Sequence, residues 1–185
     1  MFGEATGIMY IIGQVLGVAA VIVGFFSYQM KTAKKLLMFE IIVAFIFAAH
    51  YFFIGAMTAM ALNLLSAVQC IFYYFRNKRG SKSMVIPIIF TVLIVATGIL
   101  TWEGWYSVFI VIGLAVYSLA IAMPDAQMIR IAMFIKNPLC LAYNVAVLSV
   151  GGIVYECTVL VSSVIGVIRN RKSKNKRAEN KNGKI

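Results

Sequence analysis

Long apolar stretches without charge alternate along the chain with short polar connections. Because a helix needs roughly 20 apolar residues to cross the core of a bilayer, the pattern predicts an all-α membrane protein with seven transmembrane helices. The connections are only a few residues long, which favours antiparallel neighbours and leaves no extramembrane domain. The expected spans are about 6–29, 36–54, 57–75, 84–100, 104–123, 128–147 and 150–168.

The composition agrees with a membrane protein. Of the 185 residues, 62% are hydrophobic and 12% are charged, whereas a soluble domain has about a quarter of its residues charged. The first apolar stretch is too long for a signal peptide and follows no basic segment, so we expect it to remain as the first helix.

Basic residues gather on alternate connections. Residues 31–35 hold three lysines, residues 76–82 hold four basic residues and residues 169–185 hold eight, while the connections between these segments hold none or a single arginine. Lysine and arginine accumulate on the cytoplasmic side of membrane proteins, so we predict an external N-terminus and a cytoplasmic C-terminus. This distribution explains the net charge of +11 without nucleic acid as a partner. We expect the basic tail, 169–185, to be disordered and to lie near anionic lipid headgroups.

A shift of about 93 residues superposes the two halves of the pattern. Segment 36–54 then matches 129–147, and 57–75 matches 150–168, with basic residues after each pair. The alignment predicts two parallel three-helix bundles joined by a linker helix, a 3+1+3 architecture. The expected units are 1–79 for the first bundle, 80–101 for the linker helix, 102–168 for the second bundle and 169–185 for the tail.

Two ionisable residues lie deep in the expected second bundle. Lys136 is about 12 Å into its helix at the standard rise; its ammonium reaches the cytoplasmic surface, lines a pathway or forms an internal ion pair. Glu156 is a packed carboxyl, a proton-coupling group or a substrate ligand. The two residues differ in depth by roughly 9 Å, so a direct pair needs both side chains stretched.

Two more ionisable residues lie in the first bundle. His50 near the outer end of its span is either an interhelical hydrogen-bonding residue or part of a functional site. Glu40 lies about one turn from the basic connection, where it either pairs with Lys34 or Lys35 or takes part in gating.

Asn63 and Ser66 share one face of the third helix. In the shifted alignment Asn63 matches Glu156, and His50 matches Tyr143, next to Asn144, which suggests a central site shared by both repeats. Polar side chains of this kind also hold membrane helices together, and that interpretation stays open. The candidate substrate-binding residues are Asn63, Ser66, Lys136, Asn137, Asn144 and Glu156. The candidate gating or structural residues are Pro138, His50 and Glu40.

Two backbone features have structural consequences. Pro138 lacks an amide donor and disfavours helical geometry at Asn137, so we expect a kink or break there. Gly13, Gly17, Ala20 and Gly24 form a small-residue stripe along the first helix, which permits close helix packing. The three cysteines make no CxxC motif, so the sequence suggests neither a disulfide framework nor a zinc site. No metal and no cofactor are expected.

The chain resembles the YgjV family of bacterial inner-membrane proteins over about residues 10–172. The segments that carry the resemblance are AAHYFFIGAMTAMALNLLSA, SVGGIVYECT, FRNKR and IRNRK. The resemblance implies a location in the inner membrane. The family looks similar to the SWEET and PQ-loop superfamily, which implies two three-helix bundles around a central path. Members of that superfamily usually carry Pro-Gln at the end of the first helix of each bundle. This chain has no Pro-Gln at the end of its first or fifth span, so the resemblance does not imply a gate that hinges at such prolines.

These features favour a transporter or facilitator of a small polar metabolite that works by rocking of the two repeats, with proton coupling left open. The alternative is a membrane receptor, sorting or lipid-interacting protein in which the same polar residues are structural. An enzyme is not expected, because no HExxH, GxSxG or paired aspartates occur. Association of the chain with copies of itself, as a homo-oligomer, is left open.

Overall fold

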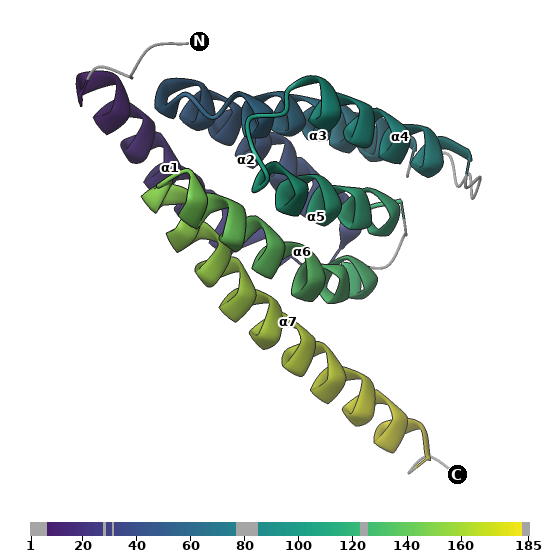
Figure 1. Cartoon of the computed structure of the whole chain (residues 1–185). Coiled ribbons are helices and arrows are strands. Elements are labelled where there is room, and N and C mark those ends of the chain that lie inside the picture. Colours follow the sequence, from purple (N-terminus) through teal and green to yellow (C-terminus); the bar gives the residue numbers. More distant parts are fainter. Residues whose placement is uncertain (1–6, 28, 31, 77–84, 123–125, 183–185) are drawn as a thin grey trace.

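The structure, a computed structural model, describes residues 7–27, 29–30, 32–76, 85–122 and 126–182. These residues form seven α-helices and no strand (Figure 1), so the all-α fold is confirmed. The helices are α1 (Gly7–Ser27), α2 (Ala33–Ile54), α3 (Met57–Arg76), α4 (Val85–Leu100), α5 (Ser107–Ala120), α6 (Ala126–Ala146) and α7 (Val150–Asn182). Lys31 and residues 77–84 and 123–125 of the expected connections lie outside the described residues.

Three helices, α1, α2 and α3, are long and apolar enough to cross a bilayer by length and composition. Helices α4 and α5 and the apolar parts of α6 and α7 are shorter, at 10–17 residues, so their insertion stays a prediction. The outward surface of the helices is apolar, as Ile11, Val15 and Ile22 of α1 show with exposed fractions of 60% or more. Such a surface is suited to lipid and would be an aggregation hazard in water.

The helices pack as two groups that touch each other. Helix α2 packs against α1 and α3, and α6 packs against α5 and α7. Between the groups, α1 lies along α7, α3 contacts α5, and α2 contacts α6 (Figure 1). Helix α4 packs on α3 and α5, which places it beside both groups.

Helices α2 and α6 end in the same way. Gly55 follows α2 with a φ of 81°, and the amide of Ala56 donates to the carbonyl oxygen of Tyr51 over 2.9 Å. Leu148 follows α6 with a φ of 54°, and the amide of Ser149 donates to the carbonyl oxygen of Asn144 over 2.9 Å. Both ends therefore form a Schellman turn around a left-handed residue, a position that glycine adopts at lower cost than leucine.

The small-residue stripe of α1 faces inward, as predicted. The buried residues of α1 are Gly13, Gly17, Ala20, Gly24 and Ser27. Gly17 meets Gly151 of α7 so closely that a Cβ built on Gly17 would lie 2.8 Å from the Cα of Gly151. The two backbones thus touch where neither residue has a side chain.

Helix α6 continues through Pro138 without interruption, so the predicted break at Lys136–Pro138 is wrong, while a bend there stays a prediction. Helix α5 packs closely against this part of α6. A Cβ built on Gly113 would lie 3.2 Å from the carbonyl oxygen of Lys136 and 3.3 Å from the Sγ of Cys140.

Helix α7 extends past the other helices towards the C-terminus (Figure 1) and ends at Asn182. The sequence predicts disorder for residues 169–185, so the helical course of 169–182 differs from that prediction. The segment holds no proline, and its first glycine is Gly183. Lysine, arginine, glutamate and alanine are good helix formers, which accounts for the helical course of this polar segment.

Candidate functional site

A cavity of about 40 Å³ lies among the helices and is lined by α2, α3, α5, α6 and α7. Its size suits a few water molecules and is far below the roughly 300–1,000 Å³ of small-molecule pockets. Both halves of the chain therefore contribute to one small cavity. The polar and sulfur-bearing lining residues are Glu40, Tyr51, Asn63, Ser66, Cys70, Tyr117, Lys136, Cys140, Tyr155 and Glu156.

Lys136 and Glu156 form an ion pair at this cavity. The Nζ of Lys136 lies 3.9 Å from the Oε1 of Glu156, and both residues are buried, with exposed fractions of 7% and 4%. The ammonium thus points inward and does not reach the surface. The depth difference expected from sequence did not prevent the pair, because α6 packs against α7 and the lysine stem is long. At 3.9 Å the two groups attract without a direct hydrogen bond.

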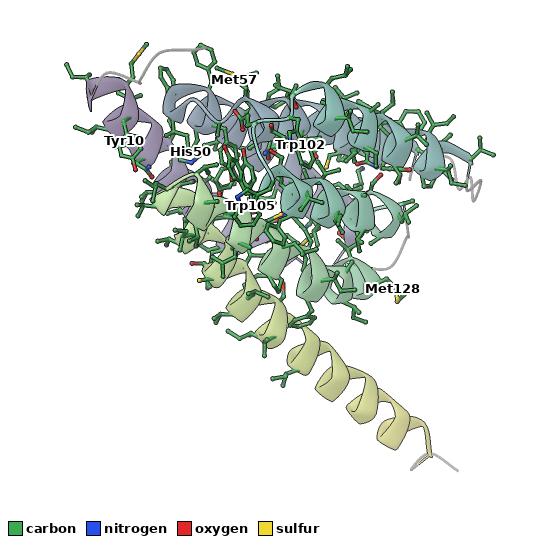
Figure 2. All side chains as sticks on the ribbon, viewed as in Figure 1. Tyr10, His50, Met57, Trp102, Trp105 and Met128 are labelled. Atoms are coloured by element: carbon green, nitrogen blue, oxygen red, sulfur yellow. The ribbon has the colours of Figure 1, made fainter. Side chains whose placement is uncertain are left out.

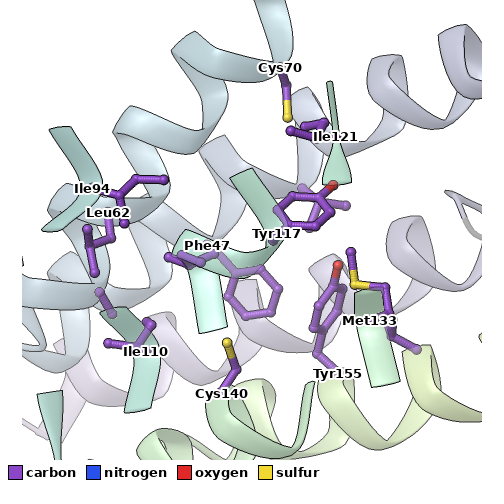
Figure 3. Packing of buried hydrophobic residues seen from close by; sticks show 14 of the residues in the cluster. Phe47, Leu62, Cys70, Ile94, Ile110, Tyr117, Ile121, Met133, Cys140 and Tyr155 are labelled. Carbon is purple, nitrogen blue, oxygen red and sulfur yellow. The ribbon is translucent and has the colours of Figure 1, made fainter. Parts of the chain in front are cut away.

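Two tyrosine rings flank the same ammonium. The Nζ of Lys136 lies 5.3 Å from the ring centroid of Tyr117 and 5.9 Å from that of Tyr155. Both distances are within the range of a cation–π interaction. Figure 3 shows these two rings close together, with Phe47 and Cys140 beside them. Nothing in the sequence marks either tyrosine, since aromatic residues are common throughout the spans.

Glu40 is held by hydroxyl groups. The Ser27 hydroxyl donates to Oε1 over 2.9 Å and the Tyr117 hydroxyl donates to Oε2 over 3.1 Å. Pairing with Lys34 or Lys35 is therefore wrong: both lysines are exposed, whereas Glu40 is on the buried face of α2 with Leu36 and Leu37. Glu40 ties α1, α2 and α5 together and borders the cavity.

The remaining predicted site residues divide into two groups. Asn63 and Ser66 line the cavity; Asn63 donates to the Ala59 carbonyl oxygen over 2.8 Å, and the Ser66 hydroxyl has no partner among the described residues. Asn137, Asn144 and Pro138 do not line it. Asn144 accepts from the Tyr51 hydroxyl over 2.7 Å, and Asn137 is fully buried, with neither side-chain polar atom bonded within the described part of the chain.

His50 lies away from the cavity, near the end of the assembly that holds Tyr10 (Figure 2). Its Nδ1 is 2.6 Å from the Gly13 carbonyl oxygen and its Nε2 is 2.7 Å from the Ser149 Oγ. The ring therefore joins α1 and α2 to the turn before α7, the interhelical role that the sequence left open.

Metal-binding chemistry has no support within the described residues, where no group of three or more histidine, cysteine, aspartate or glutamate side chains lies close enough to hold an ion. The cavity instead offers two carboxyl groups, one ammonium group and several hydroxyls. Such a set can bind a polar or charged solute.

Comparison with protein families gives one match. The model of a family described as a bacterial inner membrane protein, Imp-YgjV, matches residues 11–174. The matched range includes every residue that lines the cavity. Comparisons with curated proteins and with solved structures give no match.

Proposed function

Since the chain belongs to the Imp-YgjV family of bacterial inner membrane proteins, we propose that it is a multi-pass transporter or facilitator of a small polar metabolite. The observation that carries this proposal is the small cavity with an ion pair and a second carboxyl group in its walls. Buried charges inside a membrane bundle are costly and usually mark a solute or ion path.

A 3+1+3 arrangement is the second part of the proposal. The start of α6 is 93 residues after that of α2, and the starts of α7 and α3 differ by the same number (Ala33 and Ala126, Met57 and Val150). The turns around Gly55 and Leu148 have the same spacing and the same hydrogen bonds. If the two halves are exchanged, α1 takes the place of α5 and α7 takes the place of α3. The α1–α7 contact then corresponds to the α5–α3 contact. These features support two parallel repeats with α4 as the linker.

In the proposed mechanism, one three-helix unit rocks against the other and opens the cavity to each side in turn. Two hydrogen bonds made by tyrosines of the cavity wall join the two units. Tyr117 of α5 donates to Glu40 of α2, and Tyr51 of α2 donates to Asn144 of α6. Both bonds would break or shift as the units move, while the contacts inside each unit persist.

All seven helices cross the inner membrane in this proposal, with the N-terminus outside and the C-terminus in the cytoplasm. The alternating basic connections support that orientation. The basic residues beyond position 168 then meet anionic lipid headgroups. The polar residues act in binding rather than in catalysis, and the bilayer and the transported solute are the expected partners.

Cysteine labelling tests the rocking of the two units. Cys70 and Cys140 line the cavity and are 1% and 3% exposed, whereas Cys157 is exposed on α7. In a Cys157→Ser variant, we expect a charged, membrane-impermeant thiol reagent to modify Cys140 both in right-side-out spheroplasts and in inside-out vesicles. Modification from both sides requires that the cavity open to each side in turn.

A variant that also carries Cys70→Ser and Cys140→Ser is the control and should stay unlabelled. If Cys70 and Cys140 react from neither side until the protein is unfolded, the proposal is wrong. The residues of the cavity are then structural, as in a receptor, sorting or lipid-interacting membrane protein.

A further inference from the structure

We propose that the central cavity takes an organic cation, a small solute that carries an ammonium group, and that the Lys136 ammonium occupies the position of this group in the closed state. This inference rests on the proposed function and specifies the chemical class of its substrate. It follows from what surrounds the Nζ of Lys136 and from the charges that face the cavity.

The surroundings of the Lys136 ammonium are those of a cation site. The Nζ has the Glu156 carboxyl at 3.9 Å and two tyrosine rings, Tyr117 and Tyr155, with centroids at 5.3 and 5.9 Å. Aromatic faces combined with a carboxylate are how proteins recognise ammonium ligands. These groups come from α5 and α7, whereas the lysine comes from α6, so the site could be vacated by movement of one side chain.

The charges at the cavity are unequal. Glu40 and Glu156 both line it, whereas Lys136 is the lone lysine or arginine among its lining residues. With both carboxyl groups ionised, one negative charge faces the cavity without a counter-cation. Glu40 is held by two hydroxyl donors, Ser27 and Tyr117, and has no cation of its own within the described residues. A cationic solute would supply the missing positive charge.

Two buried groups at the cavity remain available for a ligand. The Oε2 of Glu156 and the Oγ of Ser66 have no hydrogen-bond partner within the described residues. Their residues are 4% and 6% exposed and both line the cavity. Unpaired buried polar atoms are costly. A primary ammonium, as in ethanolamine, would donate a hydrogen bond to the carboxylate oxygen, whereas a quaternary ammonium, as in choline, would meet it by charge alone. A hydroxyl group of either solute would reach the serine.

Exchange of one ammonium for another would also explain the small size of the cavity. In the absence of solute, Lys136 neutralises Glu156, and the cavity measures about 40 Å³. When the cavity opens, the solute ammonium takes the place between Tyr117, Tyr155 and Glu156, and the lysine ammonium moves to Glu40, the carboxyl group that lacks a cation. A tethered competitor of this kind lowers the affinity for the solute and keeps Glu156 paired while the site is empty.

The test compares cations with matched neutral and anionic solutes. The purified full-length chain in detergent is titrated with choline, ethanolamine, 3,3-dimethyl-1-butanol (the uncharged isostere of choline), glucose and succinate. Binding is followed as a rise in melting temperature, because a ligand of the native state stabilises it. We expect choline or ethanolamine to bind, the uncharged isostere not to bind, and Glu156→Gln to abolish the effect of the cation.

The Lys136→Met variant distinguishes a lysine that competes with the solute from a lysine with a structural role alone. Loss of the internal competitor should tighten binding of the cation at least about tenfold, which is roughly 1.4 kcal/mol. The inference is wrong if neither cation binds the wild-type chain, if the uncharged isostere binds as tightly as the cation that binds, or if Lys136→Met leaves the affinity for that cation unchanged. Binding of glucose or succinate that needs Glu156, without binding of a cation, would overturn the cation site and leave the transporter proposal standing.

Discussion

Replacement of Glu156 by alanine is expected to destabilise the protein by about 3–5 kcal/mol, because Lys136 then remains in the interior without its counter-ion. Both residues are almost fully buried and form the pair at 3.9 Å. Removal of one member of a buried ion pair leaves an uncompensated charge, which costs more than the pair itself contributes. Hydroxyl groups near Lys136 do not replace a carboxylate.

The double variant Glu156→Leu/Lys136→Met is the matched control. It removes both charges and fills the space with apolar side chains, so we expect it to recover most of the lost stability. Unfolding of each variant in the same detergent is followed by the loss of helical circular dichroism as denaturant is added. A loss below about 1 kcal/mol in Glu156→Ala, or no recovery in the double variant, would contradict the ion pair.

Gly17→Leu is expected to separate α1 from α7 and to destabilise the protein by about 3 kcal/mol, at the upper end of the usual cost of overpacking. A Cβ on Gly17 would lie 2.8 Å from the Cα of Gly151 and 3.1 Å from two atoms of the His50 ring. Backbone atoms cannot rotate away as a side chain can. The helices must move apart, and His50 would lose its bonds to Gly13 and Ser149.

Gly7→Leu on the same helix is the control, because no atom lies within 4 Å of a Cβ at that position. We expect Gly7→Leu to change stability by less than about 0.5 kcal/mol, as surface substitutions usually do. Thermal unfolding of both variants in the same detergent gives the comparison. Equal stabilities of the two variants would show that the contact between Gly17 and Gly151 is not part of the native packing.

The sequence was sufficient to predict the helices and the buried face of α1. Apolar runs of helix length have few alternatives in so hydrophobic a chain. The stripe Gly13, Gly17, Ala20 and Gly24 identifies the buried face of α1, because these small residues are three or four positions apart and so lie on one side of the helix. Family membership was also visible in the sequence and is confirmed by the match over residues 11–174.

The sequence was insufficient for contacts between helices that are distant in the chain. Tyr117 bonds Glu40 across 77 positions, and no local pattern singles out one tyrosine among the nine of the chain. Depth along separate helices also misled the interpretation of Lys136 and Glu156, because that estimate ignores how helices cross. Similarly, Pro138 does not break α6, although it removes one amide donor from the helix.

The most direct test of the transporter account is solute efflux from proteoliposomes. Vesicles containing the purified chain are loaded with a defined mixture of amines, amino acids, sugars, nucleosides and organic acids, and mass spectrometry measures which solutes leave. The Glu156→Leu/Lys136→Met variant, checked for folding, serves beside empty vesicles as the reference. We expect one chemical class to leave faster through the wild-type chain than through the variant. Equal efflux of every solute from wild-type, variant and empty vesicles would contradict transport.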